Sequence, residues 1–185
     1  MGIENLYFIA IIPEKKICDE IEAFKSDFAY HFDSREALKV IPHITLKAPF
    51  KLPSAEHGNL LRWFGGFFFD SGHFNIELRN FGAFHNKISP VVYVHPIVNA
   101  PLFSLQKEII RSFRISYPES GVSALELKFM PHITVAYRDL KPERFLEAWK
   151  VYQTKTYQAS FEVNSFHLLQ HDRKKWNIIQ TYELQ

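Results

Sequence analysis

The tetrapeptide Pro-His-Ile-Thr occurs twice in this chain, at residues 42–45 and 131–134, roughly half the chain length apart. An apolar residue follows each copy, Leu46 after the first and Val135 after the second. Side chains of a β-strand alternate between two faces. The histidine and threonine of each copy therefore share one face, while the apolar residues share the other. The repeat predicts two similar half-buried strands, one in each half of a duplicated fold.

Apolar periodicity along the rest of the chain predicts further strands and helices. Ser54 and Asn99 are of the types that cap helix N-termini, and Pro142 suits a first helical turn. The order β-α-β-α-β-β-α-β-α-β-β, with no linker, predicts an α+β fold of two duplicated lobes in a single domain, 1–185. Strands are expected at about 5–12, 40–48, 72–81, 91–95, 129–137, 157–170 and 175–183, and helices at about 13–32, 54–64, 99–114 and 142–152.

Composition and charge limit the class of ligand. Apolar residues make up 46% of the 185 positions and aromatic residues 16%, which is typical of a folded globular chain with a substantial core. The formal net charge of +2 suits an anionic ligand of limited size. It argues against a protein that coats long nucleic acid. The aromatic clusters at 63–64 and 67–69 are expected in the core and not as base-stacking platforms.

Cysteine use and hydropathy bear on location. Cys18 is the only cysteine, so the chain has neither an intrachain disulfide nor a thiolate metal cluster. The apolar run at 6–12 stops at Pro13 and is far shorter than the roughly 20 residues of a membrane span. Only Glu4 is charged ahead of this run, so it lacks the basic start of a signal peptide. We therefore expect a reducing, cytoplasmic location.

Two imidazoles and two hydroxyls on matched strands form a reagent set for phosphoester chemistry. A neutral histidine can take a proton from an attacking water while a protonated histidine gives one to the leaving oxygen. Histidine suits both roles because its ordinary pKa is about 6.5. Threonine hydroxyls can donate hydrogen bonds to the non-bridging phosphate oxygens. We therefore predict His43, Thr45, His132 and Thr134 as a catalytic set that needs no metal or other cofactor.

Three further residues near the two copies are expected to bind substrate. Strand alternation places Lys47 on the face of His43. If the second strand is regular, Arg138 falls on the face of His132 and Tyr137 on the opposite face. The cationic side chain of Lys47 or of Arg138 would help to bind a phosphate group.

A histidine on a half-buried strand more often has a structural role than a catalytic one, and the chain has nine histidines. The repeated setting favours a functional role for His43 and His132, whereas the other seven have no such context. The sequence contains no H-E-x-x-H, C-x-x-C, glycine-rich phosphate loop or G-x-S-x-G motif. Acid–base chemistry without a metal is therefore the favoured mechanism.

Two His-x-Thr-apolar motifs, one in each half, resemble the signature of the two-histidine (2H) phosphoesterases, the superfamily that includes the 2′-5′ RNA ligase-like proteins. The similarity extends over almost the whole chain. The segment HITLKAPF at 43–50 resembles a branch of small bacterial members. Three further segments resemble the family's first strand and helix, its mid-chain strand and its closing strands, namely YFIAIIPEKKICDEIEAFK, FNIELRNFGAF and FEVNSFHLLQHDRKKWNIIQTYEL.

The resemblance implies a bilobal fold with pseudo-twofold symmetry and a central cleft that holds both motifs. It also implies metal-independent opening of 2′,3′-cyclic phosphates, or related cyclic phosphodiesters, on RNA ends or small nucleotides. By analogy, His132 would be the base that activates water and His43 the acid. Some members carry an arginine five residues after the second histidine. Tyr137 occupies that position here and Arg138 follows, so Lys47 is a possible substitute for the missing cation.

Two other functions stay open at this point. A module that binds RNA ends or nucleotides without turnover would keep the same cleft. RNA ligation to form 2′-5′ links is the same chemistry in reverse, and it ranks lower because water favours hydrolysis. The expected partner is a nucleotide or RNA end with a cyclic phosphate, and neither a membrane nor a stable protein partner is implied.

Overall fold

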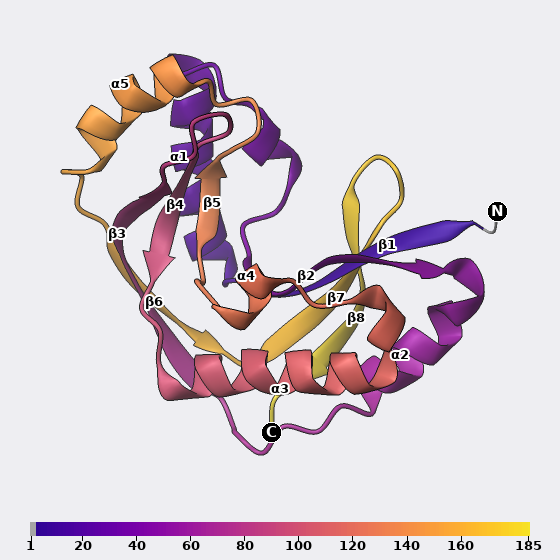
Figure 1. The fold of residues 1–185 in the computed structure, drawn as a ribbon. Coiled ribbons are helices and arrows are strands. Elements are labelled where there is room, and N and C mark those ends of the chain that lie inside the picture. Colours follow the sequence, from indigo (N-terminus) through magenta and orange to yellow (C-terminus); the bar gives the residue numbers. More distant parts are fainter. Residues whose placement is uncertain (1–2) are drawn as a thin grey trace.

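The computed structural model describes residues 3–185 as two four-stranded antiparallel sheets flanked by helices (Figure 1). The predicted α+β fold of two similar antiparallel lobes is confirmed. The first sheet contains β1 (Glu4–Ile11), β2 (Ile44–Pro53), β7 (Ser165–His171) and β8 (Trp176–Glu183), in the order β2-β1-β7-β8. The second contains β3 (Phe74–Phe84), β4 (Val91–Pro96), β5 (Ile133–Ala136) and β6 (Gln158–Val163), in the order β5-β4-β3-β6.

Helices connect these strands within the described residues. The α-helices are α1 (Lys15–His31), α2 (His57–Gly65), α3 (Ala100–Ser116), α4 (Ala124–Leu127) and α5 (Pro142–Tyr152). The short 3-10 helices are η1 (Glu36–Lys39), η2 (Ser54–Glu56) and η3 (Pro118–Ser120).

The two sheets follow one plan. In each, the strand that carries the repeated tetrapeptide forms one edge, as β2 or β5, and pairs with the strand before it, β1 or β4. All neighbouring strands are antiparallel. An edge strand has a neighbour on one side only, so each motif strand borders space that the other lobe can share.

The two long helices pack on the sheet of the opposite lobe. α1 follows β1, but its Phe24 packs against Phe81 of β3 with ring centroids 4.9 Å apart. α3 follows β4, but its Phe113 packs against Phe50 of β2 with centroids 4.6 Å apart. Figure 1 shows α5 with α1 on one lobe, and α2 with α3 on the other. This exchange interlocks the lobes around one continuous hydrophobic core.

Local chemistry accounts for most helix boundaries. The side chain of Asn99 caps α3 by accepting the backbone N–H of Leu102 at 3.0 Å, as predicted. α5 begins at Pro142, also as predicted. The prediction that Ser54 is an N-cap is wrong, because its hydroxyl donates to the carbonyl of Ile3 instead.

Several strand boundaries differ from the predicted ones. The single strand expected at 157–170 is two strands, since the chain leaves one sheet after Val163 and enters the other at Ser165. The apolar alternation shifts by one residue at this crossing, from Phe161 and Val163 to Phe166 and Leu168. This phase shift is a signal that the sequence prediction did not use. β2 runs past Pro49, its predicted end, because the missing N–H of proline is tolerated on an edge strand.

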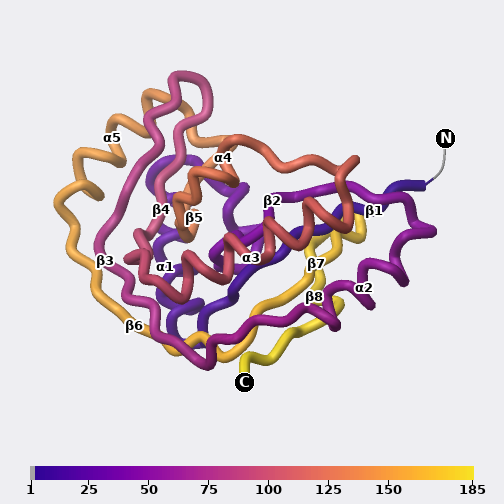
Figure 2. Tube along the Cα trace, turned by 60° about the horizontal axis from the view of Figure 1, so that its bottom comes forward, coloured from indigo at the N-terminus to yellow at the C-terminus, as the bar shows by residue number. Residues whose placement is uncertain are grey.

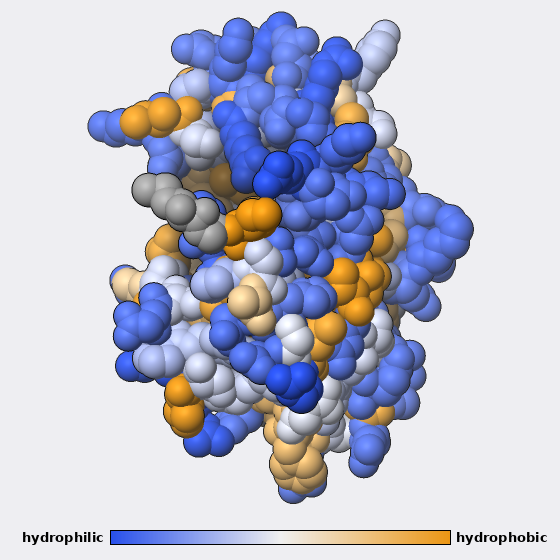
Figure 3. Space-filling model, turned by 90° about the vertical axis from the view of Figure 1, so that its right-hand side faces the viewer, coloured by the Kyte–Doolittle hydropathy of each residue, from blue (hydrophilic) through white to orange (hydrophobic). Residues whose placement is uncertain are grey.

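The surface is mixed in polarity. Figure 3 shows one face on which hydrophilic residues dominate and hydrophobic ones form small, separate groups. Within residues 3–185, no helix has the length and apolar character to cross a membrane. Figure 2 shows the turn between β3 and β4 projecting from the body of the molecule.

Candidate active site

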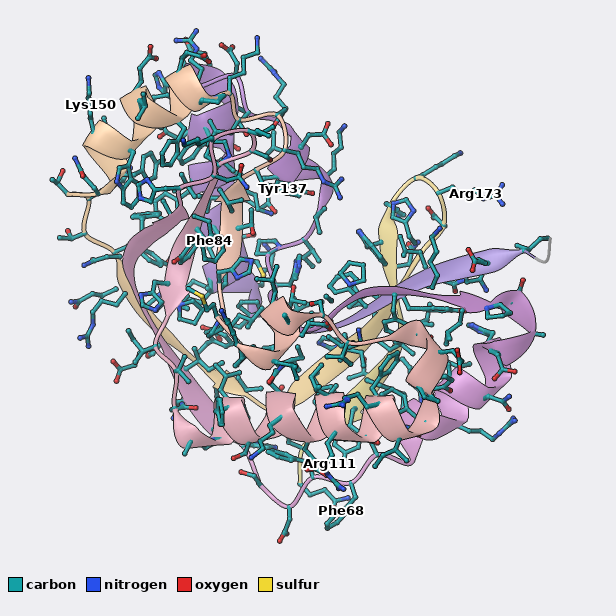
Figure 4. All side chains as sticks on the ribbon, viewed as in Figure 1. Phe68, Phe84, Arg111, Tyr137, Lys150 and Arg173 are labelled. Carbon is teal, nitrogen blue, oxygen red and sulfur yellow. The ribbon has the colours of Figure 1, made fainter. Side chains whose placement is uncertain are left out.

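A cavity of about 220 Å³ lies between the two motif strands. We call it the central cavity. Residues from both lobes line it. Figure 4 shows one of them, Tyr137, on the lobe that carries β5. Its polar lining residues are Lys25, His43, Thr45, His132, Thr134, Tyr137 and Arg138, and its apolar ones include Phe8, Ile41 and Trp176. The fold thus brings the four residues of the predicted catalytic set to one cavity.

The two histidines are held in the same way. The Nδ1 atom of His43 lies 2.7 Å from the carbonyl oxygen of Ile41, and Nδ1 of His132 lies 2.8 Å from that of Met130. A carbonyl oxygen only accepts, so Nδ1 carries the proton in both rings. The Nε2 atom of each neutral ring is therefore the unprotonated nitrogen, available to accept a proton.

Burial makes both imidazoles hard to protonate. Desolvation lowers the pKa of His43 to about 4, against the opposing effect of the Ile41 carbonyl, and the charge of Lys25 and the nearby His132 lower it further. Desolvation also lowers the pKa of His132, opposed by the Met130 carbonyl. In the free protein near neutral pH, both rings are therefore neutral. An anionic ligand beside them would favour the protonated form of either ring.

Aromatic rings enclose each histidine. Phe8 of β1 lies 4.9 Å from the His43 ring, measured between centroids, and Trp176 packs edge-on against Phe8 at 4.5 Å. On the other side, Phe84 lies edge-on to His132 at 5.1 Å and Tyr93 lies at 5.5 Å. These contacts supply the desolvation that depresses both pKa values. Sequence analysis missed these rings because aromatic residues at strand positions are ordinarily core residues.

Thr45 and Thr134 occupy equivalent positions beside the histidines. Thr45 pairs with Ala10 across β1 and β2, and Thr134 pairs with Tyr93 across β4 and β5. Both threonines are half-buried and line the central cavity. Each hydroxyl therefore borders the same space as the imidazole two residues before it.

Lys47 does not line the central cavity, and the prediction that it shares a face with His43 is wrong. Ile9 pairs with Lys47 but the next residue, Ala10, pairs with Thr45, so β2 contains an extra residue at Leu46. This bulge reverses the alternation of the strand. Lys47 is consequently 2% exposed.

The buried ammonium group of Lys47 has partners of its own. Its Nζ atom lies 2.8 Å from Oε1 of Glu126 and 4.6 Å from the ring centroid of Phe113. The same Glu126 oxygen accepts the backbone N–H of Ala48 at 3.0 Å. Lys47 therefore joins β2 to the segment that precedes the second motif.

Tyr137 and Arg138 both line the central cavity, although strand alternation would place them on opposite faces. β5 ends at Ala136, and Arg138 adopts a positive φ of 58°. The N–H of Asp139 then bonds the carbonyl of Tyr137 at 2.7 Å, which closes a tight turn. The guanidinium of Arg138 lies 5.0 Å from the ring centroid of Tyr137. Burial raises the pKa of Tyr137, so its phenol stays a hydrogen-bond donor.

Asp139 ties this turn to the wall of the cavity that precedes His43. Its carboxylate accepts the hydroxyl of Ser34 at 2.9 Å and the backbone N–H groups of Arg35 and Glu36 at 2.7 and 3.1 Å. Ser34 is fully buried. These bonds fix the start of η1, which leads directly into the first motif.

Lys25 is a lining residue that sequence analysis did not identify. It lies on α1 with only 2% of its surface exposed. Its Nζ atom donates to Oε1 of Glu22 at 2.8 Å and to the carbonyl of Val40 at 2.6 Å. A lysine that continues the buried stripe of Ile21 and Phe28 is a signal that could have indicated it. Among residues 3–185, no cluster of three or more His, Cys, Asp or Glu side chains is arranged to hold a metal ion.

Two antiparallel lobes, each with a matched histidine on one cavity, define the architecture of a two-histidine phosphoesterase. The sequence profile of the 2′-5′ RNA ligase superfamily matches residues 13–175. The chain therefore belongs to the 2′-5′ RNA ligase superfamily of phosphoesterases.

Relatives of similar length support this assignment. The chain is 26% identical over 177 residues to a protein of Bacillus cytotoxicus named “Putative phosphoesterase”, with 95% of each chain covered. It is 27% identical over 179 residues to a protein of the same name from Geobacillus thermodenitrificans, which covers 95% of this chain and 94% of the relative.

Solved structures share the fold. The protein TT0787 of Thermus thermophilus aligns with a TM-score of 0.71 and 15% identity over 97% of each chain. LigT of E. coli, in complex with 3′-AMP, aligns with a TM-score of 0.67 and 17% identity over 98% of this chain and 99% of its own.

Proposed function

We propose that this phosphoesterase is a metal-independent phosphodiesterase that hydrolyses 2′,3′-cyclic phosphates, or related cyclic phosphodiesters, on RNA ends or small nucleotides. The observation that carries the proposal is the pair of histidines on the central cavity, each with Nδ1 bonded to the carbonyl two residues earlier. Such a pair provides one proton acceptor and, after protonation of either ring, one proton donor.

The reaction divides between the two rings. The unprotonated Nε2 atom of one histidine takes a proton from water as the water oxygen attacks phosphorus. The bond between phosphorus and one ribose oxygen breaks, and the protonated histidine gives that oxygen its proton. A phosphate monoester and a free hydroxyl result. Substrate anion would favour the required protonated ring, which the free protein disfavours at neutral pH.

Donors around the cavity suit the charge that develops on phosphate. The hydroxyls of Thr45 and Thr134 border it from opposite lobes. Tyr137 and Arg138 add a phenol and a guanidinium. Fixed donors that point at the non-bridging oxygens stabilise the transition state more than the ground state. These four residues are the proposed phosphate ligands, and Lys47 is not among them.

The nucleotide part of the proposal is supported by the similar fold of E. coli LigT, which has been solved with 3′-AMP, with ATP and with phosphate. The apolar wall of the cavity, with Phe8 and Trp176, offers surfaces on which a base or ribose could lie.

A panel of 2′,3′-cyclic nucleotides and cyclic-phosphate RNA ends tests the proposal. We expect turnover of at least one substrate, unchanged by EDTA, and a loss of about 10²- to 10⁴-fold in kcat for His43→Ala and for His132→Ala. His95→Ala, at an exposed position on β4, is the matched control and should keep full activity. Binding without turnover across the panel would instead favour a nucleotide-binding module, and 2′-5′ joining of RNA ends would favour a ligase.

A further inference from the structure

The two halves of the molecule support their motifs with different buried side chains. In the first half, Nζ of Lys25 donates to the carbonyl of Val40, three residues before His43. In the second half, Nε2 of Gln106 donates to the carbonyl of Glu126 at 2.9 Å, six residues before His132. Both bonds hold the backbone that leads into a motif.

These side chains occupy comparable places on comparable helices. α1 and α3 are each 17 residues long, and each packs on the opposite lobe. Lys25 is the eleventh residue of α1 and Gln106 the seventh residue of α3, which is a difference of four positions, about one helical turn. Lys25 is 2% exposed and Gln106 is 4% exposed. A neutral amide therefore performs in one half the structural task that an ammonium group performs in the other.

The charge on Lys25 acts on one side of the cavity. Its counter-ion Glu22 is turned toward solvent, since its side chain is 37% exposed while that of Lys25 is 2% exposed. The positive end of this ion pair thus lies at the cavity wall, next to Ile41, whose carbonyl orients His43. Charges act over longer distances in such a poorly solvated place than at the surface.

We propose that Lys25 is a positioning residue that makes the two histidines chemically unequal. It anchors the backbone from which His43 is oriented and places a positive charge on the His43 side of the cavity. The other titratable groups that face His43 are His132, Tyr137 and Arg138, all from β5 or the segments that flank it. His132 is the second ring itself, and Tyr137 and Arg138 line the cavity that both rings border. Lys25 is bonded to the segment before the first motif only.

The inequality assigns roles in the proposed reaction. Repulsion from Lys25 adds to burial in keeping His43 neutral, which suits the base that activates water. His132 is then the ring that is protonated and gives its proton to the leaving oxygen. This order is the reverse of the one expected by analogy with the family. The assignment of roles rests on the proposed function, but the unequal protonation does not.

Titration of the imidazole signals by NMR tests the inference without any turnover. His43→Gln and His132→Gln assign the signals. In the unmodified protein, His43 should titrate at a lower pH than His132. In Lys25→Met, the His43 titration should rise by about 0.5 to 1 pH unit while that of His132 moves less. Lys16→Met, an exposed change on the same helix, should leave both titrations in place.

Lys25→Gln separates the charge from the hydrogen bond, because it installs the side chain type that the second half uses at Gln106. Lys25→Gln should raise the pH at which His43 titrates, as Lys25→Met does. If the methionine variant does not fold, the glutamine variant provides the same test. Given turnover of a cyclic phosphate, the acidic limb of the kcat/KM profile should move with the His43 titration. An unmoved His43 titration in folded Lys25 variants, or His132 titrating below His43 in the unmodified protein, would overturn the inference. Absence of turnover alone would count only against the proposed function.

Discussion

The proline of the repeated tetrapeptide determines how each histidine is presented. Proline fixes its own φ and restricts the residue before it to extended conformations. Pro42 and Pro131 each stand between a histidine and the carbonyl that accepts its Nδ1–H. The stiff linkage fixes the accepting carbonyl relative to the ring, so Nε2 is the nitrogen left for chemistry. The tetrapeptide occurs twice because each of the two histidine rings is oriented in this way.

The depressed pKa of His43 has a consequence for stability. Its pKa falls from 6.5 to about 4 on folding, so between those values the unfolded chain binds a proton that the folded protein excludes. The free energy of unfolding should therefore decrease as the pH falls from about 6.5 toward 4, by at most about 3 kcal/mol from this group. His43→Gln should make this decrease smaller. Urea unfolding at pH 7 and pH 4.5 measures it, with His95→Gln as the exposed control. Equal pH dependence in both variants would contradict the expectation.

Gly82 keeps space open beside the second histidine. A Cβ atom there would lie 2.5 Å from the ring of Tyr93, which packs against His132. Gly82→Ala should therefore destabilise the protein by about 1 to 3 kcal/mol and reduce kcat, because the displaced ring disturbs the histidine. Gly58→Ala is the control. A Cβ atom at Gly58 would lie 3.7 Å from Arg62 Nη1, which is an ordinary contact, so this variant should keep the stability and the kcat of the unmodified protein. Thermal unfolding and turnover assays of the two variants test this prediction. Equal effects of the two substitutions on stability and kcat would count against the steric argument.

Elements contribute to the site through their irregularities. The bulge at Leu46 turns Lys47 out of the cavity, and the tight turn at Arg138 brings two consecutive side chains into it. A regular β2 would have placed a lysine beside His43. The histidines lie directly before β2 and β5, and the threonines lie within these strands, two residues further on. The bulge and the turn determine which cations border the phosphate site.

The buried contact between β2 and α4 should show strong coupling between its charges. Glu126→Gln leaves the 2%-exposed ammonium of Lys47 without a counter-ion, which should cost about 3 to 5 kcal/mol. The double variant Lys47→Met/Glu126→Gln removes both charges and should cost much less. A double-mutant cycle by urea unfolding measures the coupling. Asp19→Asn, which breaks the exposed pair with Lys15, should have little effect, and an equally small effect of Glu126→Gln would refute the prediction.

The sequence predicted those elements in which one local rule dominates. The apolar stripe of α1, the Asn99 cap and the start at Pro142 depend on neighbouring residues only, and they were recoverable. The placement of Lys47 was not, because a bulge depends on pairing with a distant strand. Lys25 escaped notice for a related reason. Its partner Val40 is close in sequence, but the cavity it lines exists only after both lobes assemble.

At the scale of the whole molecule, the two motifs are aligned by contacts between segments distant in sequence. Asp139, just after the second motif strand, accepts three hydrogen bonds from Ser34, Arg35 and Glu36, just before the first. Lys47 and Glu126 make the complementary connection. The relative position of the two histidines therefore depends on buried polar contacts between the lobes as well as on the shared core.

Asp139→Ala should weaken this alignment. Loss of the acceptor leaves the buried Ser34 hydroxyl and two N–H groups without their partner, which should cost about 2 to 3 kcal/mol and lower kcat at least about tenfold. Urea unfolding and turnover of a cyclic nucleotide provide the two readouts. Glu147→Ala is the control, since Glu147 on α5 pairs with Arg144 at the exposed surface. If both variants behave alike, Asp139 has no special part in the geometry.

The exchange of α1 and α3 between lobes limits what a fragment of this chain can do. A cut between α2 and β3 would separate each long helix from the strand against which it packs. It would also divide the first sheet, which takes β1 and β2 from the N-terminal part of the chain and β7 and β8 from the C-terminal end. Neither fragment should therefore fold by itself.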